Sequence, residues 1–337
     1  MSSEDIAVIG AGIYGTCLAV LFGNHGHRVC LYNRNPDSAR VMQEVRENRT
    51  YLPGHRFPDT VTVTSDLETT VRGKRFVLGV TPSHGVREVL GQAAQWMDPD
   101  AIVINASKGL EDGTLQTIDA VYRDILPERI AARATYLSGP TFASELAAGM
   151  PAAIVLAGRD RESTLAAQAA LTGLNFRIYT TDDVVGVLVG GALKNVIAIG
   201  AGVSDGLGFG SNTRVALITR GLAEITRIGV ALGANAATFA GLSGMGDLVL
   251  TCSGDASRNR RVGLALGQGK KMSDILAEMK QVAEGVKTTK VAQQLASRLG
   301  VEAPITDAMY AIMYEGVGVR EAILRLLTRP VRSERDT

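Results

Sequence analysis

A short apolar run, Ile6–Ile9, leads directly into the sequence G-A-G-I-Y-G, and a helical pattern follows over Tyr14–Phe22. A glycine-rich turn between a strand and a helix is typical of a β-α-β unit that binds a dinucleotide. In such a unit Gly10 makes the tight turn, Gly12 lets the backbone approach a pyrophosphate, and Gly15 lets the helix pack on the strand. The N-terminus of the helix then faces the phosphates. The start of the chain therefore predicts dinucleotide binding on an α/β fold.

The first half of the chain alternates between strand-like and helix-like segments. We expect strands at Ile6–Ile9, Arg28–Tyr32, Val61–Thr64, Phe76–Val80, Ile102–Asn105, Thr135–Leu137, Ala152–Leu156 and Phe176–Tyr179. Helical patterns separate most of them, which indicates β-α-β units and a mainly parallel sheet. After about Asp182 only helical patterns follow. The sequence therefore predicts an α/β plus all-α protein, with a Rossmann-like domain over 1–182 and an all-helical domain over 183–337.

Composition excludes several classes of protein. The 337 residues include 38 glycines without a three-residue period and only 10 prolines, which excludes collagen and low-complexity disorder. The balance of 35 basic and 34 acidic residues gives no long-range attraction for nucleic acid or anionic membranes. Three cysteines without a C-x-x-C pair fit a reducing compartment, and the acidic N-terminus lacks a signal-peptide pattern. We expect a cytoplasmic protein without a nucleic-acid partner.

The stretch Val184–Val203 contains 20 mostly apolar residues, about the length of a membrane span. Lys194 and Asn195 stand at its centre, where an ammonium group costs roughly 3 kcal/mol even on the lenient insertion scale. We therefore interpret it as a helix buried in a protein core, without a membrane span. Burial and a neighbouring cation both lower the pKa of a lysine. Lys194 is thus a candidate proton donor and acceptor, and a salt-bridged structural lysine is the alternative.

Three further segments carry candidate functional groups. Lys108 follows an apolar strand in N-A-S-K-G, where a parallel sheet presents its binding edge. Asp247, in G-M-G-D-L, is a candidate partner for a buried lysine. Ser257 is a natural N-cap, and the helix that begins there makes a phosphate site together with Arg258 and Asn259. The alternative for this last segment is a solvated basic turn.

The second predicted strand ends in Asn33 and Arg34. A site specific for NAD usually has an acidic residue there, which would repel a 2′-phosphate. Asn33 carries no charge and Arg34 is able to pair with a phosphate, so NADP should be accepted, while the use of NAD stays open. A solvated surface arginine is the alternative for Arg34.

The four histidines lie in the first quarter of the chain: His25, His27, His55 and His84. A histidine acid in the helical domain is therefore excluded, and without a second cluster of ligands we predict no metal site. His25 and His27 flank a turn, where we expect them to be exposed. Arg220 and Glu224 are expected to form an exposed i,i+4 pair on a helix.

Seven motifs follow one another along the chain. They are G-A-G-I-Y-G-T at 10–16, N-A-S-K-G-L-E at 105–111, S-G-P-T-F-A at 138–143, G-A-L-K-N at 191–195, G-M-G-D-L at 244–248, S-R-N-R-R at 257–261 and V-A-E-G at 282–285. Together they resemble the NAD(P)-dependent glycerol-3-phosphate dehydrogenases of the bacterial biosynthetic type. The resemblance extends from Gly10 to about Tyr314.

The resemblance implies roles for individual positions. Lys194 matches the proton donor and acceptor, Lys108 a lysine that contacts cofactor and substrate, and Asp247 the partner of the catalytic lysine. Substrate contacts are implied for Lys108, Gly139, Thr141, Lys194, Asn195, Asp247, Ser257, Arg258 and Asn259. Cofactor contacts are implied for Gly10, Gly12, Ile13, Tyr14, Gly15, Arg34, Lys108, Ala143, Arg258, Val282 and Glu284. The family often has a serine where this chain has Ile13, which carries no hydroxyl.

The resemblance also implies a reaction, the reversible reduction of dihydroxyacetone phosphate to sn-glycerol 3-phosphate, the backbone of glycerophospholipids. The partner molecules are then NAD or NADP and a phosphorylated triose, and the resemblance suggests a homodimer. Two alternatives stay open. One is another two-domain dehydrogenase that uses a lysine, of the β-hydroxyacid or 6-phosphogluconate type. The other is a dinucleotide-binding redox sensor without catalytic activity.

Overall fold

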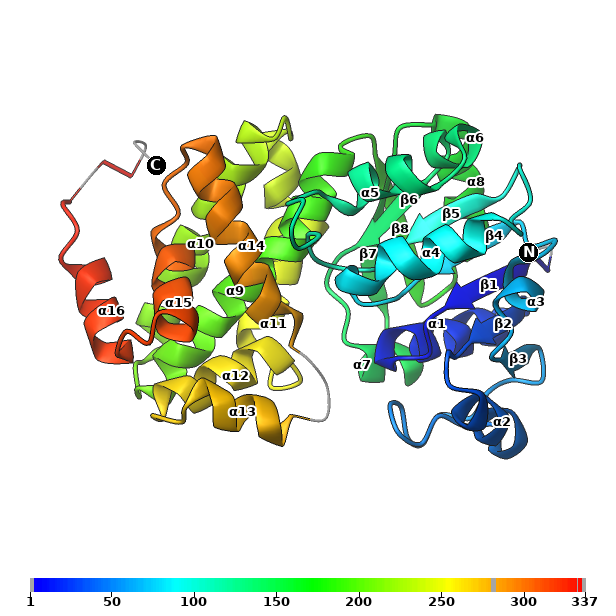
Figure 1. Cartoon of the computed structure of the whole chain (residues 1–337), viewed down its shortest axis with the longest axis horizontal. Coiled ribbons are helices and arrows are strands. Elements are labelled where there is room, and N and C mark those ends of the chain that lie inside the picture. The colour runs from blue at the N-terminus through cyan, green and yellow to red at the C-terminus, as the bar shows by residue number, and fades with distance from the viewer. Residues whose placement is uncertain (1–2, 280–282, 332, 335–337) are drawn as a thin grey trace. The chain divides into compact units, whose positions relative to one another are not determined.

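The computed structural model describes residues 3–279, 283–331 and 333–334. The chain divides into two compact units. The first, which we call the α/β unit, comprises Met1–Ser107 and Ile118–Val184; the second, the helical unit, comprises Lys108–Thr117 and Val185–Thr337. Each unit is described by itself below, with the elements labelled as in Figure 1.

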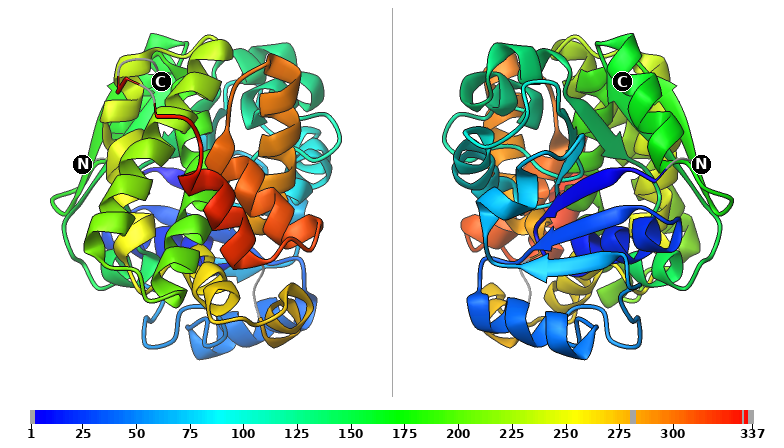
Figure 2. Two further views of the ribbon diagram at one scale, coloured as in Figure 1. Left: turned by 90° about the vertical axis from the view of Figure 1, so that its left-hand side faces the viewer. Right: turned by 90° about the vertical axis from the view of Figure 1, so that its right-hand side faces the viewer.

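The α/β unit is built on an eight-stranded sheet with the order β3-β2-β1-β4-β5-β6-β7-β8. Its strands are β1 (Asp5–Ile9), β2 (Arg28–Tyr32), β3 (Val61–Thr64), β4 (Phe76–Gly79), β5 (Ile102–Asn105), β6 (Thr135–Ser138), β7 (Ala152–Gly158) and β8 (Phe176–Thr181). Neighbouring strands are parallel except β6 and β7. The blue strands β1–β3 lie side by side in the right panel of Figure 2. All eight predicted strands are present, and the mainly parallel sheet is confirmed.

Helices cover both faces of this sheet. They are α1 (Ile13–Asn24), α2 (Pro36–Val45), α3 (Leu67–Val71), α4 (Val86–Ala94), α5 (Ile118–Ile125), α6 (Glu128–Ala132), α7 (Ala143–Ala147) and α8 (Arg161–Leu171), with a 3-10 turn at Ser83–Gly85. Alternate strand residues such as Ile6 and Leu78 pack with α1, α7 and α8. Gly79 faces Leu90 of α4 and Tyr122 of α5 on the other side. Strand β1 pairs with β2 on one side and β4 on the other, which makes its carboxyl end the point where the strand order reverses.

The expected exposure of the histidines near residue 25 is wrong for His27. This side chain is fully buried, and its Nδ1 accepts a hydrogen bond of 3.2 Å from the backbone N–H of Glu4. The turn between α1 and β2 therefore packs against the residue that precedes β1. Burial lowers the pKa of His27, which favours the neutral ring needed to accept this bond. His25 is only partly buried.

The helical unit contains no strand among its described residues. Its helices are α9 (Val184–Gly206), α10 (Ser211–Ala231), α11 (Asp247–Ser253), α12 (Arg258–Gly267), α13 (Met272–Glu278), α14 (Glu284–Leu299), α15 (Pro304–Tyr314) and α16 (Val319–Leu327), with a 3-10 turn at Ala236–Ala240 and a π-helical turn at Leu242–Gly246. Gly300 ends α14 in the left-handed conformation, at φ 65°. The N-terminal α/β and C-terminal helical architecture is thus confirmed.

Helix α9 is the core of the helical unit. In the described part of the chain it is the one helix long and apolar enough to cross a membrane, but 94% of its most apolar stretch is buried inside the fold. Glycines let other elements approach its backbone. A Cβ added at Gly202 would lie 2.0 Å from the carbonyl oxygen of Arg260, and one at Gly263 would lie 1.9 Å from that of Ile199. Helices α9 and α12 therefore pack backbone against backbone.

The expected exposed pair of Arg220 and Glu224 is wrong. Glu224, on α10, is only 1% exposed. Its carboxylate accepts hydrogen bonds from the backbone N–H groups of Ile305 and Thr306, at 2.8 and 2.9 Å, and from the Thr306 hydroxyl at 2.5 Å. Glu224 therefore caps the first turn of α15 instead of pairing with its helical neighbour.

Candidate active site

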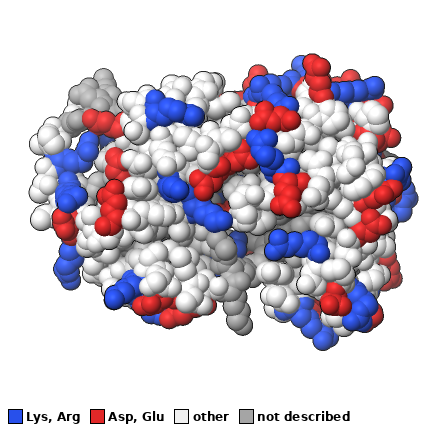
Figure 3. Space-filling model, viewed as in Figure 1, with Lys and Arg blue, Asp and Glu red and all other residues white. Residues whose placement is uncertain are grey.

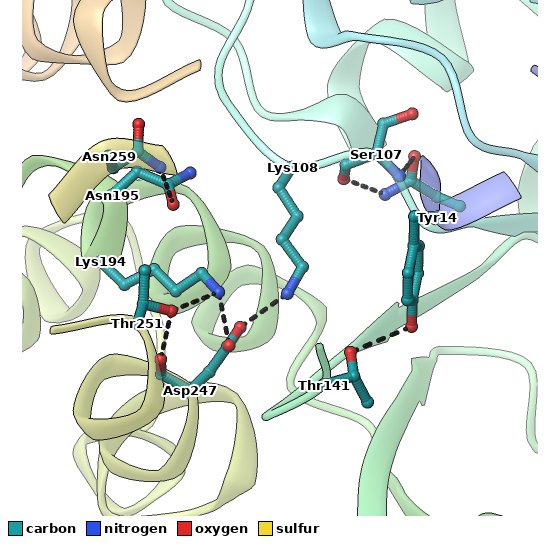
Figure 4. A network of polar contacts seen from close by, with 10 residues as sticks. Tyr14, Ser107, Lys108, Thr141, Lys194, Asn195, Asp247, Thr251 and Asn259 are labelled. Atoms are coloured by element: carbon teal, nitrogen blue, oxygen red, sulfur yellow. Dashed lines mark hydrogen bonds and ion pairs between the residues drawn. The ribbon is translucent and has the colours of Figure 1, made fainter. Parts of the chain in front are cut away.

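Lys194 lies in the middle of α9 and is only 6% exposed. Its Nζ donates to Asp247 Oδ1, and a second hydrogen bond of 2.9 Å goes to Thr251 Oγ1 (Figure 4). The Thr251 hydroxyl in turn donates to the backbone carbonyl of Asp247, at 2.6 Å, so its oxygen is available as an acceptor for the lysine. The pairing of Asp247 with the buried lysine, expected from the sequence, is present.

Asp247 begins α11, directly after the π-helical turn, and its side chain is 1% exposed. Its second carboxylate oxygen accepts from Lys108 Nζ at 2.7 Å. One buried carboxylate thus lies against two lysines, which leaves the cluster with an excess of positive charge when both are protonated. Figure 4 shows Asp247 with Lys194 on one side and Lys108 on the other.

Burial is the main cause that lowers the pKa of Lys194 from its usual value to about 7. The charge of Asp247 opposes this shift, and the charge of Lys108 adds to it. A lysine whose pKa lies near neutrality exists in both protonation states under ordinary conditions, so it is able to give a proton and to take one back.

Lys108 reaches Asp247 because its segment belongs to the helical unit. Leu110 lies in the core of that unit, and Leu115 packs against the same core. Leu115 adopts a positive φ of 59°, which is rare for a leucine and lets the short segment turn back on itself. In the α/β unit, the Asn105 side chain fixes the preceding backbone through hydrogen bonds with both the N–H and the C=O of Ser107.

The segment S-R-N-R-R has the local structure that the sequence predicts. Ser257 is the N-cap of α12, and its hydroxyl accepts from the backbone N–H of Arg260 at 3.2 Å. Arg258 is the first residue of the helix and is partly buried. Arg260 pairs with Asp205 on α9 at 2.7 Å and with Asp255 at 2.8 Å, so it anchors the start of α12.

Two of the predicted substrate residues contact each other. Asn259 donates from its side-chain nitrogen to the side-chain oxygen of Asn195 at 2.8 Å (Figure 4). Its own oxygen accepts from the backbone N–H of Gly285 at 3.0 Å. Asn195 and Asn259 are 5% and 9% exposed. The contact joins α9, α12 and α14 next to Lys194.

The turn after β1 fits a dinucleotide. Gly10 has φ 121°, and a Cβ there would lie 2.8 Å from the carbonyl oxygen of Val80. A Cβ at Gly15 would lie 1.8 Å from the carbonyl oxygen of Gly10, so only glycine allows the helix to pack this closely on the turn. Nothing in the described residues lies within 4 Å of a Cβ at Gly12, the N-cap of α1. These are the three roles that a pyrophosphate site requires of its glycines.

Sequence profiles of the NAD-dependent glycerol-3-phosphate dehydrogenases match both parts of the chain. The profile of the N-terminus matches residues 5–164, and the profile of the C-terminus matches residues 183–324. The chain belongs to this family.

Individual relatives match over nearly their whole length. The glycerol-3-phosphate dehydrogenase (NAD(P)+) of Geobacter sp. strain M21 is 51% identical over 332 residues, 98% of this chain and 99% of the relative. The enzyme of the same name from Escherichia coli O1:K1 / APEC is 48% identical over 336 residues, 99% of this chain and 98% of the relative. The crystal structure of glycerol-3-phosphate dehydrogenase from Coxiella burnetii superposes with a TM-score of 0.92 at 36% identity, covering 97% of this chain and 99% of that one.

The remaining residues that the family resemblance singled out, as substrate or cofactor contacts, fall into three groups. In the α/β unit, the hydroxyl groups of Tyr14 and Thr141 lie 3.3 Å apart, and Ala143 begins α7. Gly139 has φ 147°, which suits glycine alone. In the helical unit, Glu284 is the first residue of α14. Val282 lies outside the described residues.

Two buried hydroxyl groups lie at or shortly after the carboxyl ends of β4 and β6. Thr81 comes shortly after β4 and Ser138 ends β6. Neither Thr81 Oγ1 nor Ser138 Oγ has a hydrogen-bond partner in the part of the chain that the structure describes. Buried polar atoms without a partner are uncommon in folded proteins, so these two hydroxyls are candidates to contact a bound molecule.

The end of β2 carries no carboxylate. The Asn33 amide donates to Ser38 Oγ at 2.9 Å, and its oxygen accepts from the backbone N–H of Asn35 at 3.1 Å. Arg34 is exposed.

On the face of the molecule that Figure 3 shows, basic and acidic side chains are interspersed.

Sequence reasoning missed Thr251 as a site residue. The signal was present, because Asp247 and Thr251 are four residues apart and so lie on one face of a helix. The helix was not predicted, because its first turn follows a π-helical turn at Leu242–Gly246 that contains two glycines. Among the described residues, no group of three or more His, Cys, Asp or Glu is arranged to hold a metal ion.

Proposed function

We propose that this protein is an NAD(P)-dependent glycerol-3-phosphate dehydrogenase that reduces dihydroxyacetone phosphate reversibly to sn-glycerol 3-phosphate. The observation that supports this most strongly is Lys194, a buried lysine with a pKa of about 7 that shares Asp247 with a second lysine. The reaction needs one group that protonates an alkoxide and later removes the same proton. Family membership favours this substrate over those of other two-domain dehydrogenases.

Each member of the lysine cluster has a proposed part in the reaction. The reduced nicotinamide, when bound, supplies the hydride. Protonated Lys194 donates its proton to the ketone oxygen as negative charge develops there, and neutral Lys194 accepts it in the reverse direction. Asp247 and Thr251 orient the Lys194 ammonium group through the two hydrogen bonds that they accept. Lys108 adds positive charge close to the developing alkoxide.

The substrate phosphate is proposed to bind at the start of α12. The helix N-terminus and the Arg258 guanidinium both favour an anion, and Ser257, Asn195 and Asn259 lie at the same place. Gly139 and Thr141 are the proposed contacts in the loop after β6.

Arg258→Ala should raise the KM for dihydroxyacetone phosphate by about 10- to 100-fold, the range for a lost hydrogen bond to a charged group, with a smaller effect on kcat. Arg261→Ala removes an exposed arginine from the same helix and serves as the control. Equal KM values for the two variants would contradict this phosphate site.

The cofactor is proposed to bind at the turn of Gly10, Gly12 and Gly15, with Ile13, Tyr14 and Ala143 beside it. Arg34 would pair with a 2′-phosphate, so NADP is accepted. Lys108, Arg258, Val282 and Glu284 are the proposed cofactor contacts from the helical unit. We also propose a cytoplasmic location and a homodimer. Sedimentation of the purified protein tests the homodimer directly.

The substrate assignment is tested by initial rates in both directions. NADH and NADPH are supplied with dihydroxyacetone phosphate and with 2-hydroxy-3-oxopropanoate, and NAD⁺ and NADP⁺ are supplied with the reverse substrates 6-phosphogluconate and sn-glycerol 3-phosphate. We expect turnover of dihydroxyacetone phosphate and of sn-glycerol 3-phosphate, with NADPH and NADP⁺ accepted as cofactors. Faster turnover of a β-hydroxyacid or of 6-phosphogluconate would contradict the proposal. Binding of NADPH without turnover of any substrate would instead indicate a redox sensor.

A further inference from the structure

Three sequence motifs meet at one side chain in the helical unit. Asn259, from S-R-N-R-R on α12, contacts Asn195, from G-A-L-K-N on α9, and the backbone of Gly285, from V-A-E-G on α14. A Cβ on residue 285 would lie 2.6 Å from Asn259 Oδ1 and 2.8 Å from the carbonyl oxygen of Asn195. Glycine at 285 is therefore what allows the first turn of α14 to come within hydrogen-bonding distance.

The direction of these hydrogen bonds follows from chemistry. A carboxamide has an oxygen that accepts and a nitrogen that donates, and the two ends have nearly the same shape. The backbone N–H of Gly285 is only able to donate, so the Asn259 atom that faces it, at 3.0 Å, has to be the oxygen. The nitrogen of Asn259 then faces Asn195, and the Asn195 atom that receives this hydrogen bond, at 2.8 Å, has to be its oxygen.

The same argument fixes the other end of Asn195. With its oxygen bound to Asn259, its NH₂ group is directed elsewhere. Within residues 3–279, 283–331 and 333–334, no group accepts a hydrogen bond from this NH₂. Its nitrogen is also not among the buried side-chain atoms that lack a partner, so it is accessible. Asn195 therefore presents a donor, next in sequence to Lys194.

We propose that Asn259 is a positioning residue, which fixes Asn195 as a hydrogen-bond donor toward an oxygen atom of the substrate. Gly285, Asn259 and Asn195 form a chain of two hydrogen bonds, which we call the relay. The backbone N–H of Gly285 fixes which end of each asparagine amide donates and which accepts. The relay selects a ligand that offers an acceptor, such as a phosphate or ketone oxygen, and disfavours one that offers a donor at that point. The inference rests on the proposed function, because it takes Asn195 as a substrate contact.

Asn259→Asp tests the relay with almost no change of shape. The introduced carboxylate still accepts from Gly285, but it has no proton to donate, so Asn195 has to turn its NH₂ toward the carboxylate and its oxygen toward the substrate. We expect the KM for dihydroxyacetone phosphate to rise by about 10- to 100-fold, the range for a lost hydrogen bond to a charged group. As the pH falls and the introduced carboxyl takes up a proton, its O–H replaces the lost donor. The KM ratio of variant to wild type should then approach one.

A double-mutant cycle separates the relay from the role of Asn195 itself. Asn195→Ala alone should raise the KM. Asn259→Asp should raise it less in that background than in the wild-type background, because only the repulsion between the introduced carboxylate and the substrate phosphate is then left. Thr289→Val is the structural control, because Thr289 donates to the carbonyl of Gly285 at 2.7 Å without belonging to the relay. It should lower the midpoint of thermal unfolding and leave the KM unchanged.

Each outcome decides a different point. A wild-type KM for Asn195→Ala overturns both the substrate contact of Asn195 and the relay. It does not overturn the proposed reaction, which is tested separately by the turnover of dihydroxyacetone phosphate by the wild-type protein. A raised KM for Asn195→Ala with a wild-type KM for Asn259→Asp overturns the relay alone. Additive effects in the double variant, or a KM ratio that does not change with pH, also overturn it.

Discussion

Glu224 and Lys194 are both ionisable side chains that are almost completely buried in the helical unit, and they differ in what surrounds them. Glu224 on α10 accepts hydrogen bonds from two backbone N–H groups and a hydroxyl at the start of α15. Lys194 on α9 lies against Asp247 and Thr251, and Asp247 is shared with Lys108. Burial raises the pKa of Glu224 and lowers that of Lys194, so in both cases burial favours the neutral form.

The difference teaches that burial alone does not mark a reactive group. The partners of Glu224 are two backbone N–H groups and a hydroxyl, and none of them carries a charge. Lys194 contacts the carboxylate of Asp247, which also contacts Lys108, and a change of charge on any one of these three side chains alters the proton affinity of the others. We therefore expect substitutions at Lys194 to change the reaction, and substitutions at Glu224 to change stability.

Lys194→Met should produce the largest effect. Methionine keeps most of the volume but carries no proton, so kcat for dihydroxyacetone phosphate reduction should fall by about 10²–10⁴, the range for a general acid. The affinity for NADPH, measured by fluorescence titration, should stay near that of the wild type, because the glycine turn is unchanged. A kcat within tenfold of the wild type would contradict the role of Lys194 in proton transfer. Lys194 would then have a structural role only, as Glu224 has.

Asp247→Asn should have the next largest effect. The Asp247 charge raises the pKa of Lys194, so its removal lowers that pKa further and reduces the protonated fraction. A neighbouring opposite charge shifts a pKa by about 1–3 units, so the rate of reduction at neutral pH should fall at least about fivefold. Its pH profile should move to lower pH.

The matched control is Asp119→Asn in the α/β unit. Asp119 is also a buried aspartate, and it pairs with Arg123 and Arg159. This variant should lose stability and keep the wild-type pH profile. A pH profile that moves equally in both variants would show that the shift is not specific to the lysine cluster.

Glu224→Gln should have no effect on turnover. Its amide nitrogen would face backbone N–H donors, so the free energy of unfolding should fall by about 1–3 kcal/mol, the cost of an unsatisfied buried group. Denaturant unfolding measures the loss, and Thr306→Val, which removes only the hydroxyl donor, should cost less. A reduced kcat for Glu224→Gln, measured under conditions where the variant is fully folded, would contradict a purely structural role for Glu224.

The sequence predicted those features that depend on neighbours along the chain. The apolar runs of the α/β unit predicted all eight strands, and Ser257 was recognised as an N-cap. Lys194 was recognised because its charge stands between two apolar halves of one helix. Burying a charge costs free energy unless it is paired, so the pattern indicates a partner or a function.

Several features that depend on distant partners escaped prediction. Glu224 has the spacing of a surface pair with Arg220, but its partners are 81 and 82 residues away on α15. His27 accepts a hydrogen bond from the backbone N–H of Glu4, which is 23 residues away. The placement of Lys108 depends on Leu110 and Leu115, whose apolar character gives no indication of the unit in which they are buried.

The central claim is that Lys194 exchanges the proton of the reaction with a pKa lowered by burial. It is tested most directly by the pH dependence of kcat in both directions. Reduction needs protonated Lys194, so it should fall as the pH rises through about 7; oxidation needs neutral Lys194, so it should rise through the same value. Mirror-image profiles with a shared apparent pKa near 7 are the predicted result. Profiles that are flat across this range, or that change only near the usual lysine value of about 10.4, would contradict the account.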